Sequence, residues 1–214
     1  MKGLIIKDLT VYKRTLKKSN LIFEFALFLA LLFFNHYIGL FLFNIVILLT
    51  SGMAVAGIMF NDDSASKWEK FMIVLPVSKK DIIFSRFAAV WVILGIEFVE
   101  VLLFNILSAV IHAPAMLTTY ISFAVIGFLG AFVLSAISLT INYLKDDKLS
   151  GVVGMMTIIV AIIVSFLVYQ SGVNIIDVLN TSKTILLLLA LLGAIVSFVV
   201  SFYVSVWGFS RKHS

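Results

Sequence analysis

Long uncharged stretches, separated by short polar breaks, make up most of the chain. Residues 25–61 and 184–210 contain no Asp, Glu, Lys or Arg, and residues 87–144 contain only two acids. A helix crosses a bilayer with about 20 mostly apolar residues, each adding about 1.5 Å of length. Residues 25–61 would form a single helix of roughly 55 Å, so we expect two spans there rather than one.

Polar breaks divide these stretches into six predicted spans. Two breaks, residues 35–37 and the turn at 112–114, interrupt uncharged stretches, and three polar segments separate the stretches: 61–86, 145–148 and 171–183. Pro114 supports the second break, because proline removes a backbone donor and disfavours helix before it. The expected spans are 19–35, 38–60, 84–111, 116–143, 150–170 and 184–208. The predicted fold class is all-α: a polytopic membrane protein whose six transmembrane helices occupy 19–214.

The composition agrees with a membrane protein. Hydrophobic residues make up 62% of the chain and charged residues 13%, whereas a soluble domain carries about 25% charged residues. The chain has no cysteine, which excludes a disulfide framework and a cysteine-ligated metal site. These features argue against a soluble enzyme and against a disordered chain.

The positive charges predict the orientation. Fifteen of the sixteen Lys and Arg residues lie in 1–18, 61–86, 145–148 or the tail, and Lys183 alone lies on the other side of the predicted spans. Because Lys and Arg concentrate on the inner side, we expect both termini to be cytoplasmic in a bacterial cell membrane. The net charge of +5 then reflects topology, and no nucleic-acid partner is expected.

The segment 1–18 has the pattern of an amphipathic helix. Its apolar face consists of Leu4, Ile5, Leu9, Tyr12 and Leu16, and its basic face of Lys7, Arg14 and Lys18. This spacing predicts a helix that lies in the interface of the inner leaflet before the first span. The alternative is a solvated basic tail.

The cytoplasmic loop 61–86 carries two helix-start signals. Ser66 and Glu69 match a capping box, as do Ser78 and Asp81 further on. The first predicts a short helix over 66–75, ended by Pro76, and the second leads into the span 84–111. The apolar face of the short helix consists of Trp68, Phe71, Met72 and Leu75. That face could bind a partner or dip into the lipid headgroups, and the sequence favours neither.

The predicted span 84–111 contains two acidic residues. Glu97 and Glu100 share one helix face, with Asn105 and Ser108 nearby on the same helix. An acid inside a span is costly and normally faces a bundle interior or an aqueous cavity. We therefore expect either a transport path or a structural pair that bonds to neighbouring helices.

Several sequence motifs of enzymes are missing from the chain. The chain contains no nucleotide-binding P-loop, no H-E-x-x-H and no G-x-S-x-G, so no catalytic residue and no metal ligand is predicted.

Small residues predict close helix packing in two spans. They are Gly52, Ala56 and Gly57 in the second span, and Gly127, Ala131, Ser135, Ser138 and Asn142 in the fourth.

Three segments together resemble small ABC-2-type transporter permeases. They are the opening residues 1–9, the acidic pair and Trp within 61–71, and the Leu-Pro-Val-Ser sequence with its basic residues within 75–83. The length and the six-span layout are also similar over the whole chain. The branch most similar to this chain includes the permeases of phenol-soluble modulin exporters and of bacteriocin or antibiotic export systems.

The resemblance implies a permease subunit that pairs with a second permease, identical or different, and binds two copies of a separate ABC ATPase. ATP and Mg would bind to that ATPase, with no cofactor on this chain. The 66–75 helix would be the coupling helix, seated in a groove of the ATPase beside the N-terminal helix. The coupling residues would be Ser66, Trp68, Glu69, Phe71, Met72, Leu75, Pro76, Lys79 and Lys80.

The predicted function is the export of a hydrophobic or amphipathic substrate, such as a membrane-active peptide, across the lipid bilayer. Two alternatives remain open. One is a membrane immunity or scaffold protein without transport activity. The other is an intramembrane enzyme, which only Glu97 and Glu100 support. Binding of an ATPase would separate export from both.

Overall fold

The computed structural model describes residues 2–15, 37–72, 74–112, 117–144 and 175–212, together with four single positions between 22 and 29. Every regular element within these ranges is a helix, which confirms the all-α prediction. The helices are α1 (Lys2–Thr15), α3 (Tyr37–Ser66), α4 (Trp68–Met72), α5 (Lys79–His112), α6 (Leu117–Leu144) and α8 (Ile175–Lys212).

Three helices in the described ranges are long and apolar enough to cross a membrane: α5, α6 and residues Leu187–Arg211 of α8. They correspond to the predicted spans 84–111, 116–143 and 184–208, and α3 corresponds to 38–60. The predicted spans 19–35 and 150–170 lie outside the described residues. The count of six spans therefore stays a prediction.

Helix α3 continues past the predicted end of its span. We expected a cytoplasmic loop from residue 61, but α3 continues to Ser66. The extension is stabilised because Asp63 is buried in ion pairs with two neighbouring helices. Near its end, the Ser66 hydroxyl donates a 2.7 Å hydrogen bond to the Asp62 carbonyl. The polar sequence from Asn61 onward is therefore helix that packs against the protein.

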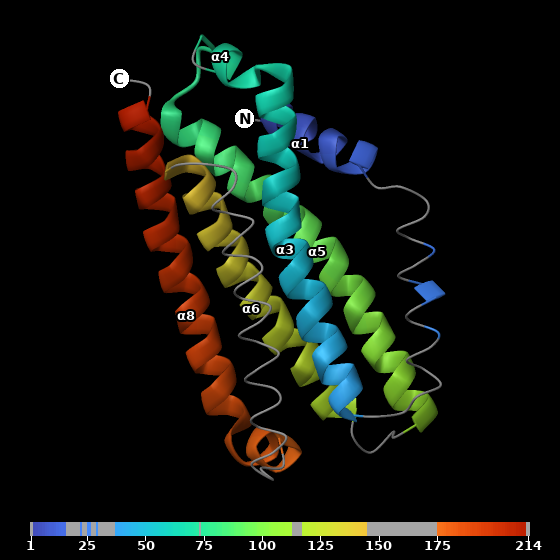
Figure 1. The fold of residues 1–214 in the computed structure, drawn as a ribbon. Helices are drawn as coiled ribbons and strands as arrows, with labels where there is room; N and C mark the ends of the chain where they lie inside the picture. The colour runs from blue at the N-terminus through green and yellow to red at the C-terminus, as the bar shows by residue number, and fades with distance from the viewer. Residues whose placement is uncertain are drawn as a thin grey trace.

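The long helices α3, α5, α6 and α8 run alongside one another, and α1 lies across one end of them (Figure 1). Helix α6 contacts α3, α5 and α8, while α1 contacts α5 and α3. Helix α4 caps the bundle at the end where α1 begins and α8 finishes. This arrangement brings three segments distant in sequence to one end of the molecule.

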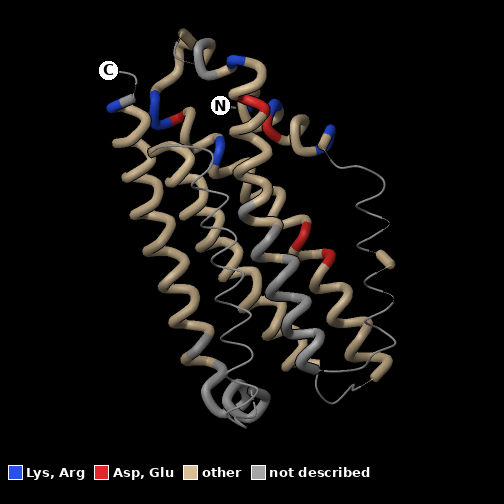
Figure 2. Tube along the Cα trace, in the orientation of Figure 1, with Lys and Arg blue, Asp and Glu red and all other residues tan. Residues whose placement is uncertain are grey.

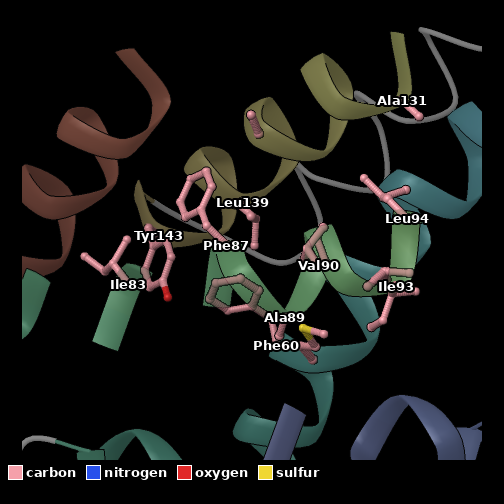
Figure 3. Packing of buried hydrophobic residues seen from close by; sticks show 14 of the residues in the cluster. Phe60, Ile83, Phe87, Ala89, Val90, Ile93, Leu94, Ala131, Leu139 and Tyr143 are labelled. Atoms are coloured by element: carbon pink, nitrogen blue, oxygen red, sulfur yellow. The ribbon is translucent and has the colours of Figure 1, made fainter. Parts of the chain in front are cut away.

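The core lies between α3, α5 and α6, and Figure 3 shows its tightly packed side chains. A side-chain carbon on Gly52 of α3 would lie 2.9 Å from the carbonyl oxygen of Ala131 of α6. Real side chains do not tolerate that distance, so the two backbones approach closely because residue 52 is glycine. The small residues predicted for α6 are all buried, which confirms their packing role.

Charged residues gather at the α1 and α4 end of the bundle (Figure 2). Away from that end, the described spans are uncharged except for acids on α5. The outer faces of α5 and α8 are apolar and exposed, with Leu103 and Leu192 as examples. Exposed apolar faces on long helices are what a bilayer requires.

Candidate functional site

Helix α4 is a short helical turn between two long helices. Lys67, which separates it from α3, has a φ of 54°, the left-handed conformation that commonly ends a helix. Helix α4 has five residues, so it is shorter than the predicted helix 66–75. Its end is marked by a 3.1 Å hydrogen bond from the Val74 amide to the Phe71 carbonyl. The chain then turns through Pro76 into α5.

The two predicted capping boxes have different outcomes. Ser78 accepts a hydrogen bond from the Asp81 amide at 3.1 Å, and its hydroxyl donates to the Asp81 carboxylate at 2.8 Å. This cap explains why α5 begins at Lys79, five residues before the predicted span. Ser66 instead closes α3, so the first box is wrong. Its hydroxyl is bonded to α3 carbonyls and no helix starts there.

The apolar side chains around α4 point in different directions. Met72 is buried in the core, and Trp68 and Leu75 are partly buried. Phe71 is 61% exposed and Val74 is 82% exposed. The predicted continuous apolar face does not form because the helix ends after little more than one turn. The exposed apolar surface at this end is therefore Phe71 with Val74, beside the exposed Pro76.

Beneath α4 lies a buried ion network that the sequence did not reveal. Arg86 of α5 lies with its Nε 3.1 Å from the Asp8 carboxylate of α1, and its Nη2 pairs with Asp63 of α3. Lys7 of α1 pairs with Asp63 and lies 3.3 Å from Asp8. Arg86, Asp63 and Asp8 are each at most 3% exposed. Two cations and two carboxylates thus balance each other, and only the Lys7 side chain, 21% exposed, reaches the surface.

The network is closely surrounded. Burial raises the pKa of the Asp8 carboxyl above its ordinary value, while Arg86 and Lys7 act in the opposite direction. The Arg86 guanidinium lies 5.1 Å from the ring centroid of Phe60, and Tyr143 of α6 lies close enough to interact with its charge. Removing one member of a buried ion pair leaves an uncompensated charge. The network therefore fixes α1 to α3 and α5 in one geometry.

Sequence reasoning assigned Lys7 and Arg86 to membrane topology and Asp63 to a loop motif. One local signal for Arg86 was present. It lies on the helix face that also carries Ile83, Phe87 and Val90, so a charged side chain there had to be buried. Its partners lie in other helices, and local spacing does not identify them.

Lys7 also connects α1 with α4. Its Nζ lies 5.3 Å from the ring centroid of Trp68. An ammonium over an indole face is attracted by the ring quadrupole. The Trp68 ring additionally packs against the core cluster. Helix α4 is thus attached to the bundle through Trp68 and Met72.

Helix α1 occupies Lys2–Thr15 of the predicted segment 1–18, and Leu16 and Lys18 lie outside the described residues. Its apolar side chains do not face away from the protein. They pack against the core cluster, and they are Leu4, Ile5, Leu9 and Tyr12. The opposite face carries the exposed Lys13 and Arg14. The position of α1 in the leaflet interface stays a prediction.

The four predicted path residues of α5 do not line one surface. Glu97 is partly buried and accepts a 2.8 Å hydrogen bond from the Tyr12 hydroxyl of α1. Glu100 is exposed on the outer face of α5. Asn105 and Ser108 are fully buried within the bundle. The Tyr12 bond supports a structural role for Glu97 and leaves Glu100 as the acid open to a substrate.

A family model described as ABC-2 family transporter protein matches residues 3–210. The chain belongs to this family. No curated protein and no solved structure matches it. ABC-2 family members are membrane components of transporters and normally work with an ABC ATPase in a lipid bilayer. As a member of this family, the chain is a transporter membrane component.

Proposed function

We propose that this chain is the permease subunit of a bacterial ABC exporter. It moves a hydrophobic or amphipathic substrate across the cell membrane with ATP hydrolysed by a separate ATPase subunit. Family membership supports transport, and the missing P-loop agrees with a separate ATPase. The observation that carries the proposal is the exposed pair Phe71, on a short helix, and Val74, in the turn that follows it, at the charged end of the bundle.

The α4 surface has the features of a docking site. Phe71 supplies an exposed aromatic side chain, the kind of residue that contributes most to small interfaces. Lys67 and Lys80 are exposed on either side and supply positive charge around the apolar centre. Rim charges of this kind guide association more than they add affinity. The complementary surface on the ATPase would be an apolar groove with acidic residues at its rim.

The transport step follows from how α4 is attached. ATP binding draws two ATPase subunits together, and each displaces the α4 that it holds. Lys7 and the ion network pass this displacement to α1, α3 and α5, so the long helices rock between inward and outward openings. Two permease chains, identical or different, would enclose the path. ATP and Mg bind to the ATPase, and this chain supplies the moving helices.

The substrate class rests on the resemblance to exporters of membrane-active peptides and on the apolar outer faces of the helices. Glu100 lies among the exposed apolar side chains Ile96, Val99 and Leu103 on α5. There an amphipathic substrate could contact apolar side chains with its apolar part and the Glu100 carboxylate with its polar part. Glu100→Gln should therefore lower substrate-stimulated ATP hydrolysis more than Glu97→Gln, because Glu97 already bonds to α1.

The test is co-purification followed by reconstitution. The tagged chain is expressed with each candidate ABC ATPase from the same genome, and any complex is placed in proteoliposomes of bacterial lipid. We expect the two to purify together and ATP hydrolysis to rise when an amphipathic peptide is added. Purification of the chain alone, with unchanged ATPase activity on mixing, would favour the alternative of an immunity or scaffold protein.

A further inference from the structure

The two aromatic side chains of α4 have different surroundings. Phe71 is largely exposed, whereas Trp68 packs against the core cluster and has a buried indole Nε1. One face of the Trp68 ring is covered by Lys7 Nζ, 5.3 Å from its centroid. A ring already packed in this way presents little surface to a second protein. Trp68 therefore differs in role from Phe71, although both belong to one helical turn.

The Lys7 ammonium lies where four helices meet. It contacts the Trp68 ring of α4, pairs with Asp63 of α3 and lies 3.3 Å from Asp8 of α1. Asp63 and Asp8 in turn pair with Arg86 of α5. The Lys7 side chain is 21% exposed, so it forms the outer edge of the network. A single cation thus joins the short exposed helix to the buried charges.

Helix α4 depends on such attachments. A helix of five residues is far shorter than the roughly 12–15 residues at which an isolated helix becomes marginally stable. Its connection to α3 passes through Lys67, whose left-handed backbone leaves no continuous helix between them. Without the Lys7 contact, α4 would be held only by the burial of Met72 and by the packing of the Trp68 ring against the core cluster. A load applied to Phe71 could then tilt α4 alone.

We propose that Lys7 is a positioning residue for transport, which fixes α4 to the buried ion network so that α1, α3 and α5 follow its movement. This inference rests on the proposed function, because it requires an ATPase that displaces α4. The predicted apolar face of the short helix would have given Trp68 and Phe71 the same role, whereas this inference assigns ATPase binding and transmission of movement to different residues. Phe71 and Val74 bind the ATPase, and Lys7 with Trp68 transmits the movement. Loss of transmission leaves binding intact but uncouples ATP hydrolysis from transport.

The experiment compares four variants of the full chain in lipid nanodiscs. Lys7→Met removes the cation, Lys7→Arg retains it, and Trp68→Leu removes the ring without changing the buried charges. Lys13→Met is the matched control, since Lys13 is exposed on the same helix. Three quantities are measured for each: the Kd for the ATPase, the stimulation of ATP hydrolysis by an amphipathic peptide, and the trypsin cleavage rate between residues 67 and 80 without ATPase.

For Lys7→Met we expect the Kd to change by less than about fivefold, because Lys7 is only partly exposed and contacts Trp68 instead of the Phe71 and Val74 surface. Cleavage between residues 67 and 80 should rise about tenfold, because it follows the population of the detached helix. Peptide stimulation should be lost. Trp68→Leu should behave like Lys7→Met, while Lys7→Arg and Lys13→Met should behave like the wild type.

Wild-type cleavage and full stimulation in both Lys7→Met and Trp68→Leu would overturn the inference. A Kd raised in proportion to the lost stimulation would also overturn it, because Lys7 would then be a docking residue. If Lys7→Met does not fold, Trp68→Leu decides between these outcomes. If the wild type binds no ATPase, the proposed function fails. The cleavage rates then refute the Lys7–Trp68 attachment if Lys7→Met matches the wild type, and support it if cleavage rises.

Discussion

Replacing Arg86 with Met should destabilise the protein strongly. Met is similar in length to the stem of Arg, so the apolar packing is largely retained and the main loss is the charge. Asp8 and Asp63 would remain buried with Lys7 as their cation, and the contact with the Phe60 ring would disappear. Removing one partner of a buried ion pair costs about 3–5 kcal/mol. For a chain of this size we expect Tm to fall by about 6–20 °C.

Thermal unfolding of the purified chain in detergent measures this effect. Arg211→Met is the control, because Arg211 lies over the exposed Trp207 ring and should change Tm by no more than about 2 °C. Adding Asp8→Asn to Arg86→Met should recover much of the lost stability, since Lys7 and Asp63 then remain as one cation paired with one carboxylate. A single Arg86→Met variant that melts with the wild type would refute the network as the joint between α1, α3 and α5.

Two further predictions concern pH and packing. In Arg86→Met the pKa of the buried Asp8 should rise further above its ordinary 3.8. A carboxyl whose pKa is higher in the folded protein stabilises the protein less as the pH rises through its folded pKa. The Tm deficit of Arg86→Met should therefore be larger at pH 8 than at pH 5. Gly52→Ala should cost about 1–3 kcal/mol because its new carbon would press on the Ala131 carbonyl. Gly57→Ala, with open space around it, should not destabilise, and melting curves of the two variants check this.

Apolar periodicity predicted the central parts of α5 and α6 but not the starts of the charged ends. Helix α5 was expected from residue 84 and begins at Lys79, because its first turn is polar and is held by the Ser78 cap. Helix α3 was expected to end near residue 60 and continues to Ser66. There a tertiary ion pair of Asp63 overrides the polar sequence, and no local pattern contains that information.

The candidate site was predictable in its location and not in its contacts. Sequence reasoning placed a short helix in the segment 61–86, and α4 lies there, although the capping box assigned to its start closes α3 instead. The different orientations of Trp68 and Phe71 depend on where that helix ends. Pairing between Lys7 and Asp63 joins residues 56 positions apart, and Arg86 is 23 positions from Asp63. Such contacts follow from helix packing and not from spacing along the chain.

Photo-crosslinking from α4 tests the central claim most directly. Single cysteines at Phe71 and Val74 carry a benzophenone label, on a chain without native cysteine. Ile111, exposed at the far end of α5, carries the same label as the control. With the ATPase present, positions 71 and 74 should form a crosslink to it and Ile111 should not. Absence of any ATPase crosslink from both positions, in membranes where the ATPase is bound, would contradict docking through α4 and the turn after it.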